Sequence, residues 1–226
     1  MPRNCRGSHN FRAAFDGLAF HFLCDRVPAM SKNIVVFDIE TKNAFDDVGG
    51  RNNLTALQIS VLGAYLYSAN EYTIFEEKEL PEFEKILQKK PLLVGFNSRR
   101  FDMPILQQYM HFDLKTLLQL DIMEELANIL GHRVSLDSVA QATLGKSKSG
   151  SGMDAIRFFR NGEMEKLKKY CLDDVKITKE IYEYGAKHGE VFYTPKFGTT
   201  KGRAPVHWKI AHPDEKEELE KQRSLF

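Results

Sequence analysis

From Asn33 onward the sequence contains three strand-like segments in succession and then alternating helices and strands, and this order restricts the possible folds most strongly. The β-branched and aromatic run at 34–39 is typical of a buried strand, and 55–67 and 71–76 predict two more strands around a turn at 68–70. Further strands are predicted at 92–96 and 117–121, and helices at 80–89, 103–111, 122–130, 136–144 and 163–187. This order predicts an α/β fold in which helices flank a mixed sheet.

The folded domain is expected to span 30–189, with a hairpin and a charged tail appended at 190–226. In that appendix, 191–193 and 206–209 are predicted to pair around 197–202, and 214–223 is a charged run typical of a solvated or frayed helix. Residues 146–152 (KSKSGSG) predict a flexible polar loop between two helices.

The first 29 residues differ from the rest of the chain. Met1–Met30 contains four Arg, no Lys and four Phe without a helical or strand period. A secretory signal needs a clean apolar stretch, but the best candidate, at 15–24, is interrupted by Asp16, Gly17 and His21. We expect 1–29 to be a poorly ordered and dispensable extension, consistent with codons upstream of a start at Met30.

Composition excludes several classes of protein. Apolar residues make up 42% and charged residues 28%, as in a soluble globular protein, and no apolar stretch is long enough to span a membrane. The net charge is +1, so nucleic-acid binding would need a local basic patch. The cysteines at 5, 24 and 171 are too few for a disulfide framework or a Cys-rich zinc site, which favours free thiols in a reducing cytoplasm.

Two acids lie in the first apolar strand. Because strand side chains alternate, Asp38 and Glu40 point the same way, away from Val35, Phe37 and Ile39. Neighbouring like charges repel unless a cation lies between them, and Mg²⁺ or Mn²⁺ prefers oxygen ligands. The alternative is a strand end at which both acids reach solvent.

Asp102 follows the strand at 92–96 and precedes Met103-Pro104 at the start of a helix. It is equally suited to cap that helix or to bind a metal ion. On the long helix at 163–187, Asp174 lies on the apolar stripe, whereas Asp173 is rotated toward solvent. A carboxylate that faces the interior must be paired or metal-bound. Tyr170 lies one turn earlier on the same face. Its side chain is expected either to pack in the ordinary way or to place its hydroxyl at the site.

These residues form three short motifs along the chain. In order, they are Phe37-Asp38-Ile39-Glu40-Thr41, Asn97 with Phe101-Asp102, and Tyr170 with Asp174. Together they closely resemble the three exonuclease motifs of the DEDD superfamily, in the subgroup with Tyr in the third motif. The likeness spans about 33–185 and is greatest to the proofreading domain of family B DNA polymerases and to bacterial stand-alone YprB-like exonucleases. It implies a ribonuclease H-like fold: three antiparallel strands, then parallel strands, with flanking helices.

The resemblance further implies the chemistry. Asp38, Glu40, Asp102 and Asp174 would bind two Mg²⁺ or Mn²⁺ ions, Glu40 would help orient the attacking water, and Tyr170 would hold or help deprotonate it. The expected activity is 3′–5′ exonucleolytic release of 5′-mononucleotides from single-stranded nucleic acid, DNA favoured over RNA, in a setting such as DNA repair. No polymerase segment follows, so the expectation is a free-standing or complex-borne enzyme, and a helicase or polymerase partner stays unknown.

Substrate contacts are expected at the second motif. Asn97 is expected to lie near the scissile bond, or else to be a turn residue, and Arg99 and Arg100 to bind backbone phosphate or to remain solvated. Phe101 packs beneath Asp102 or stacks on a base. Two basic loops, containing Lys146 with Lys148 and Lys201 with Arg203, are weaker candidates. The competing functions are a non-hydrolysing nucleic-acid-binding module of the same fold and an RNA-directed or structure-specific nuclease.

Overall fold

The structure is a computed structural model that describes residues 33–148, 150–195 and 200–208. The expectations for 1–29 and for the charged tail at 214–223 lie outside these residues. Within the described residues, no helix is both long enough and apolar enough to cross a membrane.

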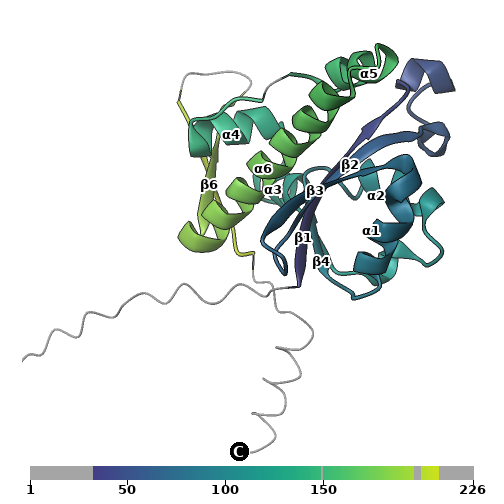
Figure 1. The fold of residues 1–226 in the computed structure, drawn as a ribbon. Helices are drawn as coiled ribbons and strands as arrows, with labels where there is room; N and C mark the ends of the chain where they lie inside the picture. The colour runs from purple at the N-terminus through teal and green to yellow at the C-terminus, as the bar shows by residue number, and fades with distance from the viewer. Residues whose placement is uncertain (1–32, 149, 196–199, 209–226) are drawn as a thin grey trace, which may run out of the picture. The chain divides into compact units, whose positions relative to one another are not determined.

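The described fold is built on a five-stranded mixed sheet in the order β3-β2-β1-β4-β5 (Figure 1). The first three strands, β1 (Ile34–Thr41), β2 (Ile59–Leu66) and β3 (Glu71–Glu76), are antiparallel neighbours. β4 (Leu92–Gly95) is parallel to β1, and β5 (Gln119–Asp121) is parallel to β4. The predicted fold class is therefore confirmed.

Helices cover both faces of the sheet. Val35, Phe37 and Ile39 of β1 share a core with α1 (Leu80–Leu87) and α2 (Asp102–Leu106). The long helix α6 (Met164–His188) packs across β1 and β2 (Figure 1). The other helices are α3 (Ile122–Leu130), α4 (Leu136–Leu144) and α5 (Gly152–Arg160). The alternation of side chains along β1 thus separates the core side from the side that carries Asp38 and Glu40.

The close approach of α6 to the sheet depends on Gly63 of β2. This glycine pairs with Asp38 in the ladder. A Cβ atom at position 63 would lie 2.9 Å from Cys171 Sγ and 3.1 Å from Val175 Cγ2, both on α6. Because only glycine leaves this space, α6 passes directly over β1 beside Asp38, and the Cys171 thiol contacts the Asp38 carbonyl at 3.6 Å.

Three of the predicted segments differ from the structure by more than two residues at a boundary. β2 begins at Ile59, where its ladder with β1 starts, and Leu54–Ala56 forms a short 3-10 helix instead. α2 ends at Leu106 and continues as a 3-10 turn. The partner of β6 (Glu190–Tyr193) is β7 (Gly202–Pro205), not 206–209, because Val206 and Trp208 are buried, and the Trp208 ring stacks on Tyr182 of α6.

Helix α5 was missed altogether. The Gly and Ser residues at 146–152 predict a loop, but in the structure a helix begins at Gly152. The overlooked signal is the Ser151-x-x-Asp154 pattern, in which the Ser151 N–H and hydroxyl donate to Asp154 Oδ2, both at 2.9 Å. Ala155 and Ile156 form its buried face.

Candidate metal centre and adjoining pocket

Three carboxylates from two elements converge beside α6. Asp38 and Glu40 of β1 and Asp174 of α6 each offer one oxygen, and these oxygens all lie within 4.8 Å of one another. Glu40 is 8% exposed and Asp174 is 3% exposed. The structure therefore brings together three of the four predicted metal ligands, and strand alternation and helix phase are the reasons.

The fourth acid, Asp102, lies against the same strand. Its Oδ1 accepts a hydrogen bond from the Ile39 N–H at 3.1 Å, between Asp38 and Glu40, and its side chain is buried. Asp102 is the first residue of α2, and the N-cap position belongs to Phe101. Its carboxylate thus bonds to β1 rather than capping the helix, and its charge helps to raise the pKa of Asp38.

A turn anchored by Asp121 holds Asp102 in place. Asp121, at the end of β5, is 1% exposed and accepts hydrogen bonds from the N–H groups of Asn97 at 2.8 Å and Arg99 at 2.9 Å. Asn97 adopts a positive φ of 67°, which Asn tolerates better than most residues. The turn is joined to the start of α2 by the Met103 N–H, which donates a hydrogen bond to the Ser98 carbonyl at 2.9 Å.

Burial and mutual repulsion make the cluster electrostatically unfavourable without a cation. Burial raises the pKa of Asp38 and Glu40, and the neighbouring carboxylates raise both further. Burial also raises the pKa of Asp102, to about 7. Burial raises the pKa of Asp174, although the charge of Lys148 opposes the shift. This donor set suits a hard divalent cation, whose charge would reverse these shifts.

Two buried polar atoms at the cluster agree with this fit. Among the described residues, neither Asp174 Oδ1 nor the Tyr170 hydroxyl has a hydrogen-bond partner. Tyr170 is close enough to favour the charged form of Asp174 but lacks hydrogen-bonding geometry. Since buried polar groups are almost always satisfied, both atoms are suited to a ligand that enters the cluster.

Lys148 is the residue at this site whose placement sequence reasoning missed. Its Nζ lies 2.6 Å from Asp174 Oδ2 and 5.6 Å from the centre of the Tyr170 ring. Burial lowers the pKa of Lys148, but the charge and hydrogen bond of Asp174 together with the charges of Asp38 and Glu40 outweigh this, and the net pKa is raised. Nothing in the Gly- and Ser-rich loop sequence distinguishes Lys148 from Lys146, whose Nζ pairs with Glu180 at 2.5 Å.

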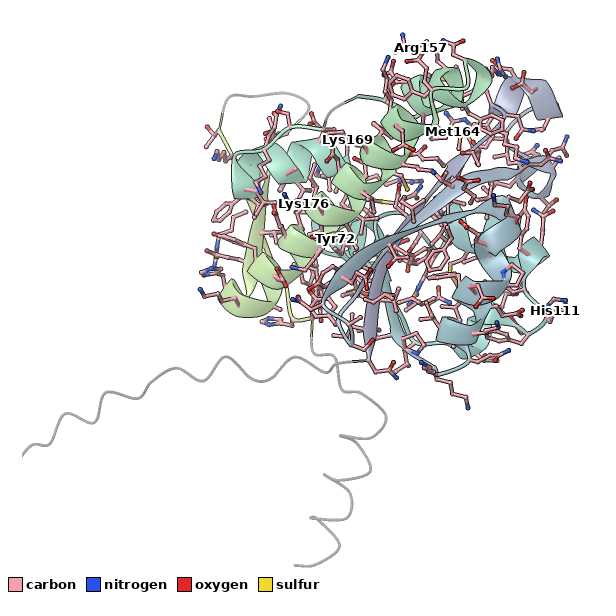
Figure 2. The ribbon with its side chains drawn as sticks, viewed as in Figure 1. Tyr72, His111, Arg157, Met164, Lys169 and Lys176 are labelled. Atoms are coloured by element: carbon pink, nitrogen blue, oxygen red, sulfur yellow. The ribbon has the colours of Figure 1, made fainter. Side chains whose placement is uncertain are left out.

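The two adjacent aspartates, Asp173 and Asp174, lie in different surroundings, and only Asp174 belongs to the cluster. Asp173 lies outside the cluster and accepts a hydrogen bond at 2.6 Å from the Nζ of Lys169, an exposed residue of α6 that is labelled in Figure 2. Tyr170 lies one turn before Asp174 and is 4% exposed. Burial raises the pKa of Tyr170 well above its usual value, so its hydroxyl is suited to donate a hydrogen bond rather than to act as a base.

The predicted substrate residues have other partners here. Asn97 Oδ1 accepts from Arg133 Nη2 at 2.6 Å, and Arg99 pairs with Glu124 at 2.9 Å and with the Gln119 carbonyl at 2.8 Å. Arg100 is exposed. Their contacts with nucleic acid stay predictions, and for Arg99 such a contact competes with two existing bonds.

An apolar cavity adjoins the cluster at Glu40. It has a volume of about 470 Å³ and is called the Glu40 pocket below. Phe101 lines it and meets the Phe45 ring edge-on, with 6.0 Å between ring centres. Its lining includes Glu40, Phe45, Leu57, Phe101, Met153 and Ile156. Phe101 therefore both packs near Asp102 and presents an aromatic surface beside the acids.

One comparison with known proteins identifies the architecture. A protein-family model described as RNase_H superfamily matches residues 35–185, a range that contains every acid of the cluster and Asp102, Lys148 and Tyr170. A search of curated proteins found no match.

Proposed function

The chain belongs to the RNase H superfamily, and from this premise we propose that it is a metal-dependent 3′–5′ exonuclease. The superfamily indicates a nuclease that acts on nucleic acid with the help of divalent metal ions. The finer proposal is the stepwise release of 5′-mononucleotides from single-stranded ends, DNA favoured. The observation that carries it is the convergence of Asp38, Glu40 and Asp174, with Asp102 alongside, in the motif order of DEDD exonucleases.

The proposed cofactor is a pair of Mg²⁺ or Mn²⁺ ions held by Asp38, Glu40, Asp102 and Asp174. Divalent cations bound at such a site activate water and stabilise charge on the entering and leaving oxygens of a phosphodiester. Four carboxylates nearly neutralise two divalent charges, which favours two ions over one. The choice between Mg²⁺ and Mn²⁺ is part of the test.

The protein groups around the cluster have separate roles in this proposal. Glu40 orients the attacking water, and the neutral Tyr170 hydroxyl holds it by donating a hydrogen bond. Asp102 is fixed by its bond to the Ile39 N–H and by the turn that Asp121 anchors. The Glu40 pocket opens beside these groups and offers room for the end of a chain.

End-labelled substrates test the proposal directly. Single-stranded DNA and RNA, labelled at the 3′ or the 5′ end, are incubated with Mg²⁺, Mn²⁺ or EDTA, beside an Asp38→Ala control. A 5′-labelled strand should shorten stepwise, a 3′ label should be released at once as a mononucleotide, and EDTA should stop both. Internal cuts would instead indicate a structure-specific nuclease, binding without products a non-hydrolysing module, and turnover in EDTA would overturn the metal dependence.

Asp174 and Asp173 provide a matched pair of variants. Asp174→Asn removes a charge from the cluster and should lower kcat/KM by about 100-fold or more. Asp173→Asn loses an exposed pair with Lys169 and should stay within about twofold of the unmodified protein. Thermal melting of both variants excludes unfolding as the cause. Equal loss of activity from the two substitutions contradicts the assignment of the third motif.

A further inference from the structure

The Glu40 pocket lies between two segments that are far apart in sequence. One wall is the β1–β2 connection, which contributes Phe45 and Arg51, and the other is the first half of α5, from Ser151 to Ile156. Figure 1 shows α5 beside this connection, at the end of β1 and β2. Glu40 belongs to both the pocket and the acid cluster, so an occupant of the pocket lies next to the proposed reaction centre.

Two charged contacts connect the walls away from the pocket. Arg160 Nη2, at the last residue of α5, lies 2.5 Å from Asp47 Oδ2 of the β1–β2 connection. Lys42 Nζ lies over the Phe159 ring, 5.8 Å from its centre. The second half of α5 is thus joined to the opposite wall, while the first half faces the cavity. Met153 and Arg160 lie on one continuous nine-residue helix, so the cavity wall and the ion pair are parts of the same element.

The surfaces that face each other across the pocket are suited to a flat apolar group. Met153 of α5 is 63% exposed, the largest exposed fraction among the large apolar side chains of the described residues. The opposite wall presents Phe45, over whose ring the Arg51 guanidinium lies at 5.1 Å. A thioether, an aromatic ring and a guanidinium are groups on which nucleobases pack, without preference for sequence.

We propose that α5 determines which chain ends this site accepts. Met153 packs against the unpaired base of the terminal nucleotide, and the Arg160–Asp47 ion pair sets the distance between α5 and the opposite wall. Met153 is a specificity-determining residue, and Arg160 and Asp47 are positioning residues. The proposal rests on the proposed function, since it takes the occupant to be the end of a nucleic-acid strand, and a paired end must open before its base can enter.

Binding of a terminal fluorescent base tests the role of Met153. The probe is single-stranded DNA with 2-aminopurine at its 3′ end, titrated in Ca²⁺, and the same strand labelled at its 5′ end is the control. Met153→Ala should raise the Kd of the 3′-labelled probe about fivefold and reduce its fluorescence change. Ile129→Ala, on α3 and also exposed, at 43%, should leave both unchanged. Both positions are on the surface, so melting temperatures should be equal.

Charge reversal tests the ion pair. Asp47→Asn and Arg160→Gln should each raise the Kd about two- to threefold, a small effect because both side chains are partly exposed. The double variant Asp47→Arg with Arg160→Asp should recover affinity, which a purely structural loss would not do. No change with Met153→Ala, or a further loss in the charge-reversed pair, overturns the inference.

These results are separable from the test of the proposed function. If the protein hydrolyses no strand but binds the 3′-labelled probe in a Met153-dependent way, the exonuclease proposal fails and the role of α5 stands. If it shortens strands normally and Met153→Ala changes neither Kd nor kcat/KM, the exonuclease proposal stands and the role of α5 fails.

Discussion

At the scale of single residues, the ion pair between Lys148 and Asp174 has a simple electrostatic cause. The acid cluster gathers several carboxylates in a buried place, and Lys148 brings one positive charge to within 2.6 Å of Asp174 Oδ2. An ammonium group offsets part of the repulsion that a divalent cation would offset more fully. We therefore expect Lys148 to contribute most to the stability of the fold when no metal ion is bound.

Substitution of Lys148 should make stability depend more strongly on metal. Lys148→Met leaves the buried carboxylates with less compensation, so the melting temperature should fall in EDTA, and added Mg²⁺ should recover most of the loss. Differential scanning fluorimetry in both buffers measures this. Lys146→Met, from the same loop and paired with the less buried Glu180, is the control and should change little in either buffer. An equal loss with and without Mg²⁺ would mean that Lys148 acts through packing.

At the scale of elements, the turn between β4 and α2 positions Asp102. Asp121 accepts from the N–H groups of Asn97, Arg99 and Glu124 and so joins the end of β5 to this turn and to the start of α3. Gly95 belongs to the same arrangement, because a Cβ atom there would lie 2.6 Å from the Ser98 side chain. The turn places Asp102 against Ile39, and the charge of Asp121 adds to burial in raising the pKa of Asp102.

Removal of the Asp121 carboxylate should destabilise this turn. Asp121→Ala leaves three N–H groups without their acceptor at a position that is 1% exposed, and the free energy of unfolding should fall by about 2–4 kcal/mol. Asp113→Ala is the control, because this exposed cap accepts a single bond, from the Lys115 N–H, and should cost about 1 kcal/mol or less. Urea unfolding of both variants measures the difference, and similar losses would contradict the role given to Asp121.

At the scale of the whole molecule, the site is assembled from three distant parts of one chain. β1 supplies Asp38 and Glu40, the start of α2 supplies Asp102, and α6 supplies Asp174. The sheet order places β1 at the centre, between β2 and β4, so that α6 and α2 both reach it (Figure 1). All of these residues fall between positions 38 and 174.

Truncation of the chain tests the predicted limit of the domain. A protein that starts at Met30 keeps β1, which begins at Ile34, and every residue of the site. It should therefore melt at the same temperature as the full chain and have the same kcat/KM on single-stranded DNA. A loss of folding or activity would show that 1–29 belongs to the functional unit.

Much of the candidate site could be predicted because its pattern is local. The period of two along 34–40 placed Asp38 and Glu40 on one side of β1, and the period of 3.6 along α6 separated Asp174 from Asp173. α5 was missed because Gly150, Gly152 and the serines around them resemble a loop, although Ser151 and Asp154 form a capping pattern. The second hairpin strand was predicted too far along the chain because Val206 and Trp208 are apolar. In the structure these side chains are buried by packing and do not belong to the paired strand.

Periodicity thus sufficed for most of the elements and for the faces on which Asp38, Glu40 and Asp174 lie, because these depend on neighbours a few residues apart, and motif order indicated the sheet type. The partners of Lys148, the wall that α5 forms and the contact between Arg160 and Asp47 could be seen only once the chain was folded. Those contacts join residues across loops whose conformation no local pattern encodes, and the close packing of α6 over Gly63 likewise brings together segments that are far apart in sequence.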